Sequence, residues 1–494
     1  MSSDHALPFS RRQWLLVGAQ LSAQTNRTPS TEPHFWTLCE AAGQLRKRKI
    51  SSEELTRLCL DRIRRRNDRL NAFITITGDS AIEQARAFDR DSDRRLIRGP
   101  LHGLPIALKD NIDTAGVLTT AASQFFATRI PTEDAEMARR VRQAGAVQLG
   151  KLNLDEFAFA GTGTTGSFGP AHNPWNLDHI TGGSSAGSAA ALGDGLCFAS
   201  IGSDDGGSVR IPGAHCGVVG FKPSFGRAST RGIVPSAYSL DCPGPMARSV
   251  EDAALMLSVM AGNDPLDAIT LDRPVPDYSR ALHDSVANLR IGAPRPYFFD
   301  NLDPDVAANV EAAINLMKRK TRQVRDVTLP LFPLVEGGST DIELYHYHRQ
   351  MFDASPEKYH STSRRMLERA KAVSAERYVE TLKRIREARR DVRHTFEEVD
   401  VLLLPTMREP APLIKEIVEQ THRLPLSNVS AFNRFGLPAL TLPCGFSRDG
   451  LPIGLQVVGP YFGESVVLAT AFAYQQSTEW HLKHPVGQVS DLPI

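Results

Sequence analysis

Two glycine-serine turns stand close together in residues 181–210, and both could present a serine hydroxyl for acyl transfer. The first reads GGSS at 182–185 and contains Ser184, and the second reads GGS at 206–208 and ends at Ser208. Paired glycines let the backbone approach another group closely and adopt dihedral angles that other residues avoid. Each turn can therefore expose backbone NH groups beside a hydroxyl, which suits attack on a carbonyl carbon.

A serine hydroxyl is a poor nucleophile unless a neighbouring group takes its proton. Lys109 follows the apolar stretch LPIAL at 104–108, which predicts a buried strand. Burial disfavours the charged form of lysine and lowers its pKa, so Lys109 could be neutral and act as the base. GSSAG at 183–187 also matches a GxSxG nucleophile turn, but no clear apolar strand leads into it. The residues thus permit a Ser/Lys mechanism.

The elements around these residues predict an α/β fold. Strand 104–108, helix 132–145 and strand 146–149 follow one another, and such alternation is typical of a sheet covered by helices on both faces. Ser51, with Glu54 three residues later, predicts a helix start with a capping box. Residues 436–443 and 451–459 predict two strands joined by a turn at Asp449 and Gly450.

The composition favours a small or neutral partner. The 494 residues carry 57 Lys and Arg against 56 Asp and Glu, a formal charge of +1, so no global field attracts nucleic acid or an anionic membrane. The six cysteines form no CxxC pair or metal-ligand cluster, and no apolar run approaches the ~20 residues that span a bilayer. GTGTTG at 161–166 matches GxGxxG without the strand and helix of a dinucleotide site, and we expect a pocket-lining loop there. We predict no metal, no cofactor, no nucleic acid and no membrane.

The chain divides by composition into an extension and one large domain. Residues 1–34 are polar and predict an N-terminal extension, and residues 35–494 predict the domain. SRRQWLL at 10–16 resembles a twin-arginine export signal, but Gln20 interrupts the short apolar run after it. We therefore predict a cytoplasmic protein, with export as the alternative. Residues 264–395 are divergent and largely helical in pattern, and we expect them to line the substrate pocket together with residues 125–126 and 157–168.

Three stretches, GLPIALKDNID, TGGSSAGSAAAL and GSDDGGSVRIPGAHCGVVGFKPSFGR, resemble the amidase signature family in order and spacing. The resemblance covers about residues 35–262 and resumes in DVLLLPT and GLPALTLPCGFSRDGLPIGLQVVGP. It implies a single large α/β/α domain with a mixed central sheet covered by helices on both faces. It also implies hydrolysis of an amide, aryl amide or carbamate C–N bond through a covalent acyl-enzyme.

The resemblance implies a role for each site residue. Ser208 corresponds to the nucleophile, Ser184 to a bridging serine that follows a cis peptide bond, and Lys109 to the general base. Ser185 corresponds to a structural serine. The oxyanion hole would consist of four backbone NH groups, those of Asp205, Gly206, Gly207 and Ser208.

One residue departs from the family pattern. Asp205 stands where many members carry threonine or a small or aliphatic residue. A carboxylate so close to a developing oxyanion should face away from it, and we expect Asp205 to point toward Arg210.

Two readings of the function remain open. The first is a stand-alone amidase acting on a small-molecule amide with water, for which a homodimer is one compatible assembly. The alternative is the glutaminase (A) subunit of a tRNA-dependent amidotransferase, which would have partner chains. Residues 339–405 lack the S-N-L-x-R-Y-D-G type of stretch associated with that subunit, which favours the first reading. A nucleotide-binding module is disfavoured because no GK[ST] motif is present.

Overall fold

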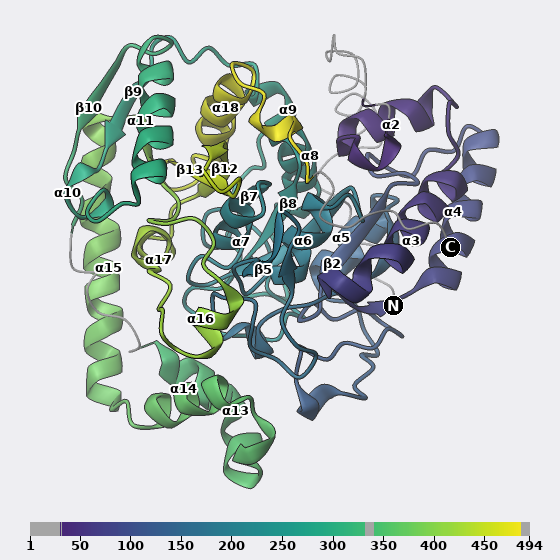
Figure 1. Cartoon of the computed structure of the whole chain (residues 1–494), viewed down its shortest axis with the longest axis horizontal. Coiled ribbons are helices and arrows are strands. Elements are labelled where there is room, and N and C mark those ends of the chain that lie inside the picture. Colours follow the sequence, from purple (N-terminus) through teal and green to yellow (C-terminus); the bar gives the residue numbers. More distant parts are fainter. Residues whose placement is uncertain (1–29, 31, 331–339, 486–494) are drawn as a thin grey trace.

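A mixed sheet of 11 strands forms the centre of the protein in the computed structural model, which describes residues 30, 32–330 and 340–485 (Figure 1). The strand order is β1-β3-β2-β6-β8-β7-β12-β13-β11-β9-β10. The strands are β1 (Phe73–Ile76), β2 (Pro105–Lys109), β3 (Val147–Leu152), β6 (Ala199–Asp204), β7 (Val219–Lys222), β8 (Cys242–Ala247), β9 (Arg290–Ala293), β10 (Gln323–Asp326), β11 (Val401–Pro405), β12 (Ala439–Phe446) and β13 (Pro452–Val458). A separate two-stranded sheet pairs β4 (His172–Asn173) with β5 (Asn176–Ile180).

The sheet joins parallel and antiparallel pairs. Strand β2 runs parallel to both β3 and β6, and β9 runs parallel to β10 and β11. The middle strands β8, β7, β12 and β13 are antiparallel to their neighbours. The predicted mixed α/β sheet is therefore confirmed, and β2 and β6 lie side by side in it.

Helices pack around this sheet (Figure 1). Those before the middle of the chain are α2 (Leu38–Arg46), α3 (Ser52–Leu70), α4 (Gly78–Asp93), α5 (Glu136–Gln143), α6 (Ala186–Gly193), α7 (Arg210–His215) and α8 (Val250–Met260). The later ones are α9 (Tyr278–Ala281), α10 (Arg295–Phe298), α11 (Pro304–Lys318), α13 (Asp341–Ala354), α14 (Ser361–Lys371), α15 (Ala375–Glu398), α16 (Ile414–Val418), α17 (Ser427–Arg434) and α18 (Glu464–Gln475). Helices α2–α4 lie at one end of the view and α15 at the other.

Local sequence signals explain several element boundaries. Helix α3 begins after Ser51, whose side chain accepts a hydrogen bond from the Glu54 amide while Glu54 bonds back to Ser51, as the capping box predicts. All five residues of β2 are buried, in agreement with its continuous apolar sequence. Strands β12 and β13 pair antiparallel on either side of the turn at Asp449 and Gly450, which confirms the predicted hairpin.

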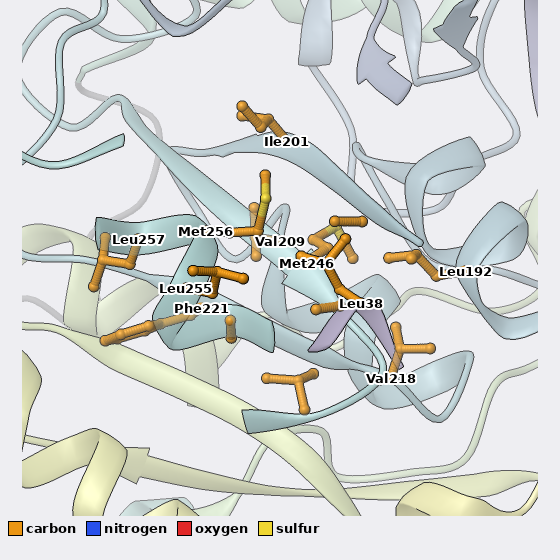
Figure 2. Close-up of a cluster of buried hydrophobic side chains, with 14 of the residues drawn as sticks. Leu38, Leu192, Ile201, Val209, Val218, Phe221, Met246, Leu255, Met256 and Leu257 are labelled. Carbon is orange, nitrogen blue, oxygen red and sulfur yellow. The ribbon is translucent and has the colours of Figure 1, made fainter. Parts of the chain in front are cut away.

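A continuous apolar core supports the strand that leads to Ser208 (Figure 2). Ile201 on β6, Phe221 on β7 and Met246 on β8 are no more than 1% exposed. Val209, the residue after Ser208, is fully buried in the same cluster. Because a core of this density resists displacement, it fixes the backbone on both sides of Ser208.

The segment 264–395 contributes both strands and helices. Strands β9 and β10 extend the central sheet, whereas α13 and α14 lie together at the lower edge of the view (Figure 1). Most of the predicted extension 1–34, including the twin-arginine-like stretch, lies outside the described residues. Among the residues that the structure does describe, no helix is both long and apolar enough to cross a bilayer.

Candidate active site

Strand β2 delivers Lys109 to the site, where its side chain is fully buried. The Lys109 Nζ lies 2.7 Å from the Ser184 Oγ and 2.9 Å from the Ser203 Oγ, with the Ser203 carbonyl at 3.4 Å. Burial lowers the Lys109 pKa to about 8, although nearby carboxylates, Asp205 foremost, oppose the shift. About one-tenth of the side chains are neutral at pH 7 with such a pKa, so Lys109 can serve as a base.

Ser184 follows a cis peptide bond between Gly183 and Ser184, and its side chain is fully buried. A Cβ on Gly183 would lie 2.1 Å from the Asp155 Oδ2, which leaves no room for a larger residue. Glycine is therefore required at this position by packing. The cis bond stands at the place that the family resemblance implied.

A loop at 161–166 packs against this first turn. The Gly183 amide donates to the Gly161 carbonyl at 2.7 Å, and the Asp155 carboxylate accepts from the amides of Gly163 and Thr165 at 2.8 and 3.0 Å. None of residues 161–171 is helical, so the GxGxxG pattern lacks the helix that a dinucleotide site needs. Asp155 instead connects this loop to the glycine turn of Ser184.

The second turn places Ser208 next to the first one. The Ser185 amide donates to the Ser208 carbonyl at 3.1 Å, and the Ser185 hydroxyl donates to the Ser203 carbonyl at 3.3 Å. Ser208 is 4% exposed, and its hydroxyl makes no hydrogen bond to any of the residues that the structure describes. Catalytic hydrogen bonds in unliganded enzymes are often long and shorten when substrate binds. The Ser208 hydroxyl is thus left without a protein partner among the described residues, as a nucleophile that awaits substrate would be.

A buried ionic network holds the Ser208 turn. Arg210 and Asp204 are both fully buried, with the Arg210 Nε and Nη2 at 3.0 and 2.9 Å from the two Asp204 carboxylate oxygens. Arg210 also donates to the side chains of Asn433 and Gln456. Burial by itself would raise the Asp204 pKa, but the Arg210 charge and hydrogen bonds outweigh it and keep this pKa well below its usual range.

The same carboxylate engages one predicted oxyanion-hole donor. The Gly207 amide donates to the Asp204 Oδ1 at 2.8 Å, so the expectation that Gly207 contributes to the oxyanion hole needs correction. The other three predicted donors, the amides of Asp205, Gly206 and Ser208, make no hydrogen bond to another of the described residues. These three remain candidates to bind an oxyanion.

The predicted orientation of Asp205 toward Arg210 is wrong, because Arg210 pairs with Asp204 instead. The Asp205 Oδ2 accepts a hydrogen bond from the Ser236 hydroxyl at 3.0 Å. Burial raises the Asp205 pKa, and the neighbouring Asp204 charge adds to the rise. Asp204 is the last residue of β6 and Asp205 lies in the bend after it, and the two side chains take different partners.

Several buried side chains of the site carried no clear sequence signal. Ser203 contacts Lys109 directly, and Asn111 donates to the Ser203 Oγ at 3.1 Å. Asn433 and Gln456 reach the Ser208 turn from α17 and β13, more than 200 residues along the chain. The described residues include no group of three or more His, Cys, Asp or Glu arranged to hold a metal ion.

The chain belongs to the Amidase family, whose sequence profile matches residues 54–468. Together with the site, this membership defines a hydrolase of C–N bonds. The chain is similar to the A-subunit of the glutamyl-tRNA(Gln) amidotransferase of Moorella thermoacetica, with 40% identity over 92% of this chain and 99% of that protein.

Solved structures are also similar. A chain from the structure of a vestigial protein complex that reveals the evolutionary origins of an s-triazine catabolic enzyme has 31% identity and a TM-score of 0.84, covering 89% of this chain and 98% of that one. A 6-aminohexanoate cyclic dimer hydrolase has 28% identity and a TM-score of 0.83, covering 92% and 99%.

Proposed function

We propose that this protein hydrolyses a carboxamide through a Ser208 acyl-enzyme, with Ser184 as proton relay and Lys109 as base. The observation that carries the proposal is the 2.7 Å contact between the Lys109 Nζ and the Ser184 Oγ in a fully buried environment. A buried lysine with a pKa near 8 can take the proton of the Ser184 hydroxyl, and Ser184 in turn takes the proton of the Ser208 hydroxyl.

The steps then follow from proton balance. The Ser208 oxygen attacks the carbonyl carbon, and the negative charge on the carbonyl oxygen is met by the amides of Asp205, Gly206 and Ser208. Lys109 returns its proton through Ser184 to the leaving nitrogen as the C–N bond breaks. Water enters, gives a proton to the same relay and attacks the ester, and Ser208 is released with its proton restored.

Glutamine is the carboxamide that the sequence comparison favours. Curated relatives at about 40% identity over nearly their full lengths are the glutaminase-type (A) components of amidotransferases. This supports the glutaminase alternative at least as well as a stand-alone amidase. In that role the chain would release ammonia from glutamine and work with partner subunits.

A stand-alone amidase is the second candidate. The absence of an S-N-L-x-R-Y-D-G stretch in 339–405 favours an amide other than glutamine. In either case the substrate is a small molecule, and no cofactor takes part in the proposed steps.

A hydrolysis panel of glutamine, aliphatic amides, anilides and carbamates separates the two candidates. We expect the wild type to release ammonia or amine from at least one class, and Ser208→Ala to lose that activity by about a thousandfold or more. Fastest release from glutamine supports the glutaminase reading. Activity that survives in a folded Ser208→Ala variant refutes the mechanism.

A further inference from the structure

The residue before the glycine pair, Asp205, carries a carboxylate beside the proposed active site. Asp205, Asp241 and Asp341 form no ion pair within the part of the chain that the structure describes. They come from three segments: the Ser208 turn, the stretch before β8 and the start of α13. Such carboxylates either stay protonated or meet a cation from outside.

Asp205 comes directly after the strand residues that flank the catalytic lysine. Ser203 points to Lys109, with 2.9 Å between the Ser203 Oγ and the Lys109 Nζ, while Asp204, the last residue of β6, points to the buried Arg210. Asp205 follows at once, is the foremost carboxylate acting on Lys109, and stands three residues before Ser208.

Ser236 fixes the Asp205 carboxylate in place. The Ser236 hydroxyl donates to the Asp205 Oδ2 at 3.0 Å, and the Ser236 amide donates to the Asp241 Oδ2 at 3.0 Å. Ser236 thus donates a hydrogen bond to each of the two carboxylates. Burial raises the pKa of both Asp205 and Asp241, and a neighbouring charge adds to each rise, that of Asp204 for Asp205 and that of Asp205 for Asp241.

Few cations of the chain face these carboxylates. Lys109 must be neutral to act as a base, and Arg434 at the end of α17 acts electrostatically on both Asp341 and Asp205. The Arg434 Nη1 donates to the Ser430 hydroxyl at 3.2 Å rather than to a carboxylate. When Lys109 is neutral, Arg434 and Arg369 act on these three carboxylates, so the carboxylates outnumber the arginines near the Ser208 hydroxyl, whose residue is 4% exposed.

We propose that Asp205 is a specificity-determining residue that selects amides carrying an ammonium group a short distance from the scissile carbonyl. This inference rests on the proposed amide hydrolysis. An ionised Asp205 beside the developing oxyanion opposes its formation, because like charges repel. A substrate ammonium paired with Asp205 removes that repulsion, so oxyanion formation is favoured for cationic substrates and disfavoured for neutral or anionic ones.

Matched amides of equal length test the inference. β-Alaninamide, 4-aminobutanamide and 5-aminopentanamide are compared with butanamide, pentanamide and hexanamide by ammonia release. We expect the wild type to prefer the cationic member of at least one pair by roughly tenfold or more in kcat/KM, as a charged hydrogen-bonded pair allows. Asp205→Asn should reduce that ratio to about one to three, by the same reasoning.

Two controls keep the result interpretable. Asp178→Asn removes an exposed carboxylate on β5 and should leave the ratio unchanged. If Asp205→Asn does not fold, as judged by thermal unfolding, Asp205→Thr takes its place.

Binding to the Ser208→Ala protein, measured by calorimetry, gives an answer that needs no turnover. Weaker binding of the cationic amides to Ser208→Ala/Asp205→Asn than to Ser208→Ala alone supports the inference. No preference for the cation, or a preference that survives the loss of Asp205, overturns it. Hydrolysis of the neutral amides by the wild type would in that case leave the proposed function intact, whereas Ser208-independent hydrolysis would remove the proposed function itself.

Discussion

Removing the Ser203 hydroxyl should shift the pH at which Ser208 becomes reactive. The Lys109 ammonium has three acceptors for its three N–H bonds, the hydroxyls of Ser184 and Ser203 and the Ser203 carbonyl. Neutral Lys109 needs fewer of them, so the Ser203 hydroxyl stabilises the charged form more than the neutral form. Ser203→Ala should therefore lower the Lys109 pKa.

The size of the shift follows from the geometry. Burial has already moved the Lys109 pKa from 10.5 to about 8, a change of about 3 kcal/mol. A hydrogen bond to a charged group contributes about 1.5–3 kcal/mol, or about one to two pKa units. The Lys109 pKa in the Ser203→Ala variant should then fall to about 6–7, so that about half or more of the Lys109 side chains would be neutral at pH 7.

The pH dependence of the reaction of Ser208 with phenylmethylsulfonyl fluoride reports the Lys109 pKa without knowledge of the substrate. The rate of mass gain on the intact protein is followed from pH 5.5 to 9.5, and we expect the wild-type rate to rise through about pH 8. Ser203→Thr keeps the hydroxyl and is the matched control. A Ser203→Ala midpoint equal to or above that of the wild type would refute the assignment of Lys109 as the base held by Ser203.

Two further predictions concern stability. Asp204→Asn leaves Arg210 buried without its carboxylate, so the free energy of unfolding in urea should fall by about 3–5 kcal/mol. The exposed Asp178→Asn control should change this free energy little. Equal urea midpoints for Asp204→Asn and the wild type would show that the ion pair is not needed for stability. His348 is fully buried and burial lowers its pKa to about 3, so below pH 6.5 the unfolded chain takes up a proton that the folded chain does not, and stability falls as the pH falls. His348→Gln should reduce the loss between pH 6.5 and 4 by about 3 kcal/mol, and an unchanged slope would contradict the assignment.

The sequence predicted the elements whose signal is local. Lys109 lies at the end of β2, which an apolar stretch forms, and the glycine pairs mark both serine turns, so Lys109 and Ser184 meet as expected. Capping at Ser51 and the turn at Gly450 are likewise decided by neighbouring residues.

Features that depend on tertiary contacts could not be predicted. The direction of Asp205 was missed because two adjacent aspartates look alike in sequence, and only their tertiary partners, Arg210 for Asp204 and Ser236 for Asp205, distinguish them. Asn433 and Gln456 became part of the site through packing between distant segments, for which no local pattern exists. The engagement of the Gly207 amide by Asp204 follows from the same packing.

The Arg210 network has a consequence for biosynthesis. The proposed catalytic side chains and the Asp204 carboxylate that neutralises Arg210 are made early, yet the side-chain amides that also accept hydrogen bonds from Arg210 are added only at Asn433 and Gln456. A nascent chain that has passed the Ser208 turn still lacks these two amide groups that hold Arg210. The ribosome must therefore complete most of the polypeptide before the nucleophile reaches its working position, which delays the appearance of a reactive serine until the whole domain can fold.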